Sequence, residues 1–66
     1  MKINYQDFGY TEDDILMNPC TGSVDTAKNW ALESARWNRD IETAQMQFSQ
    51  LIHVVFDEET NYWIEA

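Results

Sequence analysis

One long apolar stripe constrains this chain more than any other feature of its sequence. Between residues 23 and 51, apolar or small side chains recur at alternating intervals of three and four, the spacing of one helix face. Thr21, Ser23 and Asp25 are candidate N-caps, and no glycine or proline follows Gly22. The pattern predicts one amphipathic helix of about 28 residues, roughly 40 Å long. Its stripe consists of Ala27, Trp30, Ser34, Trp37, Ile41, Ala44, Phe48 and Leu51.

Two runs at the end of the stripe have the composition of a β-hairpin. Residues 51–56 are β-branched or aromatic, apart from a leucine and a histidine, and residues 61–65 contain Tyr-Trp-Ile. The polar residues 57–60 between them make a connection of hairpin length. Alternation predicts two faces, of which the first is the better core. The first face would carry Ile52, Val54, Phe56, Tyr62 and Ile64, and the second Leu51, His53, Val55 and Trp63.

The N-terminal third predicts one more strand and a short helix. Ile3 and Tyr5 alternate with polar residues, which suits a third strand with one dry face. Residues 11–17 have the capping-box pattern of a helix start, and Asn18-Pro19 would end that helix after one or two turns. We therefore expect a single α+β domain over residues 1–66, in the order strand, short helix, long helix, strand, strand. The long helix would pack on a small antiparallel sheet that ends in a C-terminal hairpin.

The predicted helix is too long for the predicted sheet. Strands of five or six residues span roughly 17 to 20 Å, so about half of the helix would overhang them. The helix must bend, end early, or pack its overhang on a second copy of the chain. Trp30 and Trp37 occupy equivalent positions of the stripe, which favours self-association through a helix-to-helix contact. A plain core stripe is the alternative.

The residue inventory favours a protein without catalysis. One cysteine and one histidine, Cys20 and His53, exclude an internal disulfide and a four-ligand zinc site. The sequence fixes no nucleophile or carboxylate near His53, and two glycines cannot build a phosphate-binding loop. The two acidic triplets are contiguous, whereas calcium loops place their ligands at alternate positions. We expect no enzyme activity, no metal site and no cofactor.

The charge of the chain narrows the class of partner. Twelve acidic and four basic side chains give a net charge of −8 at pH 7. This charge disfavours direct binding to nucleic acid or to an anionic membrane, and it would attract a basic surface. Residues 49–66 contain four carboxylates and no lysine or arginine. Without a membrane-length apolar run or a signal-peptide pattern at the N-terminus, we expect a cytoplasmic location.

Two explanations of the acidic excess compete: a merely solvated surface, and carboxylates that imitate phosphates. Under the second, the chain would occupy a basic nucleic-acid-binding surface of a protein or ribonucleoprotein. In that respect it looks like the acidic inhibitors that phages and mobile elements use against host enzymes or defence complexes, and it would act in the host cytoplasm. The residues expected to bind the partner are Glu12, Asp13, Asp14, Asp57, Glu58, Glu59 and Glu65, with Trp63 as the aromatic anchor.

A second function class stays open. A small homodimeric structural or regulatory subunit would be recognised through its apolar helix and sheet faces. Its binding would be largely insensitive to salt, whereas charge-guided docking weakens steeply as salt rises.

Overall fold

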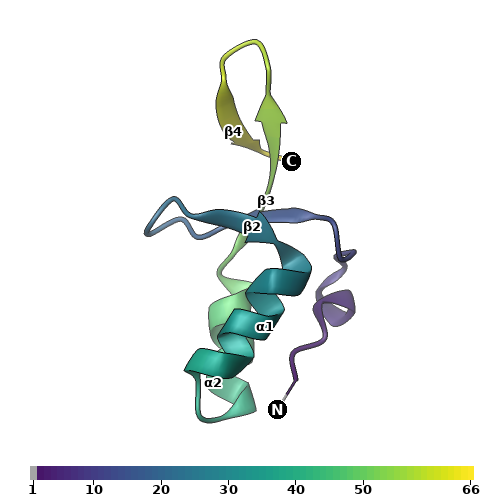
Figure 1. Ribbon diagram of the computed structural model, residues 1–66, viewed down its shortest axis with the longest axis vertical. Coiled ribbons are helices and arrows are strands. Elements are labelled where there is room, and N and C mark those ends of the chain that lie inside the picture. The colour runs from purple at the N-terminus through teal and green to yellow at the C-terminus, as the bar shows by residue number, and fades with distance from the viewer. Residues whose placement is uncertain (1) are drawn as a thin grey trace.

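A computed structural model describes residues 2–66 and places them in an α+β fold (Figure 1). Its elements are the 3-10 helix η1 (Tyr5–Phe8), β1 (Ile15–Met17), β2 (Val24–Thr26), α1 (Ala27–Trp37), α2 (Ile41–Ser49), β3 (Ile52–Asp57) and β4 (Tyr62–Glu65). The strands form one antiparallel sheet in the order β2-β1-β3-β4. The predicted α+β class and C-terminal hairpin are confirmed.

The predicted long helix is instead two helices, α1 and α2, which pack side by side (Figure 1). Asn38 ends α1 with an extended backbone, and its side-chain amide donates to the Ser34 carbonyl at 2.7 Å. Asp40 caps α2 by accepting from the Thr43 backbone N–H at 2.8 Å and from the Thr43 hydroxyl at 3.0 Å. Hydrogen bonds from Thr43 lower the pKa of the Asp40 carboxyl below its ordinary value, the larger effect coming from the backbone N–H and the smaller from the hydroxyl. Side-chain capping thus divides the stripe where no glycine or proline does.

The N-terminal third differs most from its prediction. Tyr5 lies in η1 rather than in a strand, and the segment predicted as helical turns forms β1. The capping-box contact does form, because Asp14 Oδ2 accepts from the Thr11 N–H at 2.8 Å, but it closes a turn instead of starting a helix. α1 begins later than expected, with Thr26 as its N-cap.

The core lies between the two helices and one face of the sheet. Phe48 of α2 is fully buried, and its ring centroid lies 4.8 Å from that of Phe8 and 6.2 Å from that of Tyr10. Trp30 of α1 donates from its indole N–H to the Leu16 carbonyl at 2.8 Å, which ties α1 to β1. The buried cluster consists of Ile3, Leu16, Ala27, Ala31, Ala44, Phe48 and Leu51.

The β3-β4 hairpin projects from the sheet on the side away from the helices (Figure 1). β1 pairs with β3 only at Ile52 and His53, whereas β4 pairs with β3 from Val54 to Asp57. Beyond Val54, β3 therefore has β4 as its only neighbouring strand among the described residues. This projection makes the molecule 40 Å long and 22 Å wide.

Candidate interaction surface

One face of the sheet carries no helix, and its side chains are mostly apolar. Residues directly paired in a sheet point to the same face, and residues two apart along a strand share a face. The pairing of β1, β2, β3 and β4 therefore places one set of side chains on the same side of these strands, which we call the outer sheet face. Its members are Ile15, Met17, Val24, Thr26, Ile52, Val54, Phe56, Trp63 and Glu65.

The outer sheet face is unusual for a solvated sheet surface. Antiparallel sheets covered on one side normally alternate between apolar residues inside and polar residues outside. Here only Thr26 and Glu65 are polar. Val54 is buried, but Phe56 and Trp63 are 47% and 39% exposed. Their rings form an edge-to-face pair with centroids 5.3 Å apart, so an aromatic pair is presented to solvent.

The opposite face of the hairpin is also apolar where it passes beyond the helices. Val55 pairs with Ile64, and each is 46% exposed. Tyr62, opposite Asp57, is 72% exposed. The hairpin thus presents apolar side chains on both faces.

The predicted division of hairpin faces was wrong. Phe56 lies with Trp63, not with Tyr62 and Ile64, and the set expected to be the better core is largely exposed. The connecting loop is residues 58–61 rather than 57–60, and a one-residue slip moves every side chain to the other face. Asn61 has a left-handed backbone with φ of 60°. Asparagine tolerates that conformation better than most residues, so it was the available signal for the true end of the loop.

The carboxylate of Asp57 organises the hairpin turn. It accepts from the Glu59 backbone N–H at 3.1 Å and from the Thr60 hydroxyl at 3.0 Å. The Asn61 N–H donates to the Asp57 carbonyl at 2.8 Å. Of the predicted acidic triplet at the tip, Asp57 has a structural role, whereas Glu58 and Glu59 are exposed and free to meet a partner.

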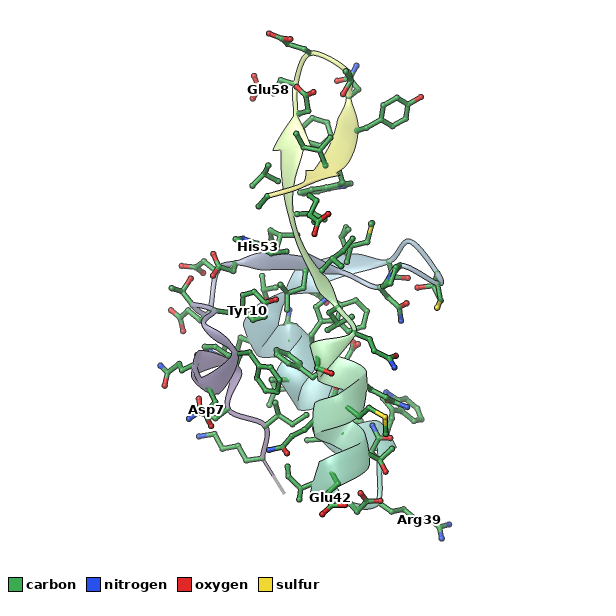
Figure 2. All side chains as sticks on the ribbon, turned by 180° about the vertical axis from the view of Figure 1, so that it is seen from behind. Asp7, Tyr10, Arg39, Glu42, His53 and Glu58 are labelled. Atoms are coloured by element: carbon green, nitrogen blue, oxygen red, sulfur yellow. The ribbon has the colours of Figure 1, made fainter. Side chains whose placement is uncertain are left out.

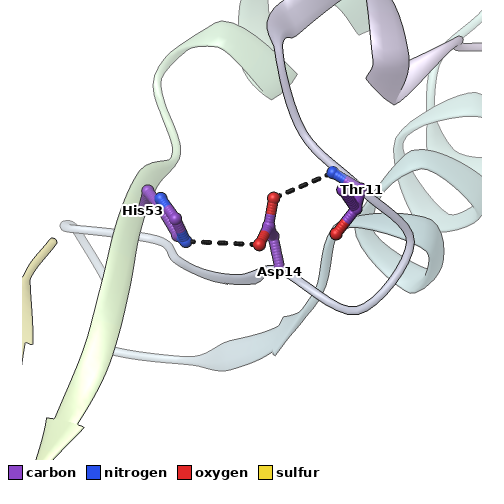
Figure 3. A network of polar contacts seen from close by, with 3 residues as sticks. All are labelled: Thr11, Asp14 and His53. Carbon is purple, nitrogen blue, oxygen red and sulfur yellow. Dashed lines mark hydrogen bonds and ion pairs between the residues drawn. The ribbon is translucent and has the colours of Figure 1, made fainter.

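The other predicted acidic triplet, residues 12–14, lies in the turn before β1 and not at the tip of the hairpin. Glu12 and Asp13 are exposed in the turn before β1, and Asp14 Oδ1 lies 3.6 Å from His53 Nε2 (Figure 3). Asp57 is four residues beyond His53, a distance of roughly 13 Å along an extended strand. Glu65 lies between these levels, opposite Val54. The predicted carboxylates are therefore distributed between the turn before β1, the end of β4 and the tip of the hairpin rather than gathered at one point.

The basic side chains lie elsewhere. Arg39 is at the end of the molecule opposite Glu58, at the loop between the helices (Figure 2). Lys2 and Lys28 line a groove of about 380 Å³ between the N-terminal segment and α1, and no acidic side chain lines it. Within residues 2–66 the Asp14–His53 contact is the one side-chain contact of salt-bridge distance, so no lysine or arginine pairs with the carboxylates of the hairpin.

The two tryptophans predicted to mediate self-association have different environments. Trp30 is half-buried against the core and hydrogen-bonded to β1, whereas Trp37 is 78% exposed at the end of α1. They do not form one exposed seam, because α2 of the same chain packs beside α1. Of these two tryptophans, only Trp37 is exposed enough to contact a partner.

Other kinds of site find little support in the described part of the chain. No three histidine, cysteine or carboxylate side chains of residues 2–66 come together as metal ligands. None of the helices in that range combines the length and the apolar character needed to cross a membrane. Comparison with known proteins gave no matching family model, no similar curated protein and no similar solved structure.

Proposed function

We propose that this chain is a non-catalytic binding protein that docks through its projecting hairpin on a basic surface of another protein or ribonucleoprotein. The observation that carries the proposal is an exposed aromatic pair, Phe56 and Trp63, in a segment, residues 49–66, that has four carboxylates and no lysine or arginine. Protein interfaces are enriched in aromatic anchors with a polar rim. The hairpin supplies both.

The charge distribution supports a guided encounter. Four carboxylates and no lysine or arginine occur in residues 49–66, whereas Lys28 and Arg36 lie on α1, Arg39 lies between the helices and Lys2 lies in the N-terminal segment. Such a separated charge distribution orients the hairpin toward a basic surface and raises the association rate. In the most specific form of the proposal, the target surface normally binds nucleic acid. The docked hairpin would then exclude that nucleic acid, as an inhibitor of the phage or mobile-element type.

Charge reversal at the tip tests the proposal. The double variant Glu58→Lys/Glu59→Lys keeps Asp57 and therefore the turn, while Asp7→Lys/Glu33→Lys makes the same charge change at exposed helical positions. Immobilised wild-type protein should capture a partner from lysate at low salt and release it at high salt. The hairpin variant should capture none and the helix variant should capture as much as wild type. Equal capture by all three proteins would refute the proposal.

The outer sheet face favours a second candidate, a small homodimeric structural or regulatory subunit. Two copies packed through their outer faces would bury the apolar side chains of all four strands. Binding of this kind should persist at high salt. Analytical ultracentrifugation at micromolar concentration decides the matter, since a monomer mass would remove this candidate.

A further inference from the structure

β4 is an edge strand with an open side. Paired residues of antiparallel strands alternate between those that exchange hydrogen bonds and those that do not. The Ala66 N–H donates to the His53 carbonyl at 2.9 Å, which makes the pairs Val55–Ile64 and Asp57–Tyr62 the bonded ones. The backbone groups of Trp63 and Glu65 therefore point away from β3. No strand among residues 2–66 pairs with that side.

The open edge lacks the usual protection against pairing. Natural edge strands are shielded by proline, lysine, a bulge or a covering loop. β4 reads Tyr-Trp-Ile-Glu, all four residues are exposed, and Glu65 is its only charged side chain. A two-stranded hairpin is marginally stable in water by itself, so a third strand would stabilise it.

The charge of the hairpin selects the occupant of the edge. A second copy of this chain would bring four more carboxylates against Asp57, Glu58, Glu59 and Glu65. An extended segment with lysine or arginine at alternate positions would instead place positive charge beside Glu65, the one carboxylate on β4. Like charges placed side by side on neighbouring strands destabilise the pairing, and opposite charges favour it.

We propose that β4 binds an extended basic segment of a partner protein as a fifth strand of the sheet. Main-chain hydrogen bonds to Trp63 and Glu65 supply affinity, and alternate side chains supply specificity. Basic side chains of the added strand lie beside Glu65 on the outer sheet face, and apolar ones on the other face lie beside Tyr62 and Ile64. This mode of binding rests on the proposed docking function and specifies how the hairpin meets its partner.

A synthetic peptide tests the mode directly. The probe is an eight-residue peptide of alternating lysine and valine, blocked at both ends. Its control has the same side chains but an N-methyl group on every residue, so it keeps its charge and has no backbone N–H with which to pair along either edge. The probe should slow hydrogen exchange at the Trp63 and Glu65 amides at least tenfold, and the control should leave both unchanged. Failure of the probe to slow exchange at these amides overturns strand addition.

Two separate changes at Glu65 distinguish the contribution of its backbone N–H to peptide binding from that of its carboxylate. Chemical synthesis of the 66-residue chain with an N-methyl group on Glu65 removes the outward N–H and keeps the carboxylate. The variant Glu65→Gln keeps the N–H and removes the negative charge. N-methylation should weaken peptide binding at least tenfold at all salt concentrations. Glu65→Gln should weaken it less, and only at low salt. The same edit at Trp63 provides a second variant if N-methyl-Glu65 changes the circular dichroism spectrum.

The outcomes distinguish the binding mode from the function. If Glu58→Lys/Glu59→Lys abolishes peptide binding but N-methylation at Trp63 and Glu65 does not, strand addition is wrong and charge-guided docking stands. If neither change affects binding, both proposals fail. Protection of the Trp63 and Glu65 amides in the protein alone, with a dimer mass in the ultracentrifuge, would identify a second copy as the occupant and overturn the basic-segment proposal.

Discussion

The two halves of β3 have similar residues but differ in how far those residues are buried. Val54, in the first half of the strand, is buried, as is Leu51 of the core cluster just before the strand begins. One and two residues after Val54, Val55 and Phe56 are nearly half exposed, because β1 and the helices have ended and only β4 lies alongside among the described residues. Burial along this strand is therefore decided by the layers that cover it rather than by its own composition.

The largest expected effect on the free energy of unfolding comes from comparing alanine substitutions at Phe48 and Phe56. Phe48→Ala removes a fully buried ring and should cost about 3 to 5 kcal/mol, most of the stability of so small a domain. Phe56→Ala removes a half-exposed ring and its edge-to-face partner, at a cost of about 0.5 to 1.5 kcal/mol. Urea unfolding followed by circular dichroism measures both. Equal costs would mean that the hairpin belongs to the core.

The two tryptophans of α1 give a smaller contrast. Trp30→Ala removes packing against the core and leaves the Leu16 carbonyl without its donor, so we expect a loss of about 2 to 4 kcal/mol. Trp37→Ala should change the free energy of unfolding by no more than about 0.5 kcal/mol, because the side chain is 78% exposed. The urea midpoints of the two variants measure this difference. A large loss of stability for Trp37→Ala would favour the predicted self-association through both tryptophans.

The smallest expected effect concerns the break between the helices. The hydrogen bonds from Thr43 lower the folded pKa of Asp40 below the ordinary aspartate pKa, so its cap contributes fully above that ordinary pKa and is lost as pH falls through the lowered one. Asp40→Asn removes this titration. The difference in urea midpoint between wild type and variant should shrink as pH falls from 6 to 3. A difference that stays constant with pH would contradict the assigned cap.

The sequence predicted the α+β class and the hairpin because both follow from strong local patterns. It did not reveal the helix break, since a stripe with three- and four-residue spacing fits two packed helices as well as one long one. The Asp40–Thr43 cap was the local signal. β1 was mistaken for helical turns because its three residues are too few to show periodicity, and the contact between Thr11 and Asp14 suits a turn equally well.

The candidate site was predicted in part. Trp63 and the carboxylates of the tip do lie together on an exposed element. The sequence pattern assigns Phe56, Tyr62 and Ile64 to the core because apolar residues are more often inside, but all three are exposed, on both faces of the hairpin. The absence of a covering layer is a property of the whole fold. No local pattern reports it.

Native-state hydrogen exchange tests most directly whether the hairpin is an element apart from the core. The amides of Val55 and Ile64 report on the hairpin, and those of Ala31 and Phe48 report on the helices. We predict that the hairpin amides exchange through local opening that hardly depends on urea, with a free energy at least about 1.4 kcal/mol below that of the helices. If all four amides show the same opening free energy and the same dependence on urea, the hairpin unfolds with the core and is not an independent docking element.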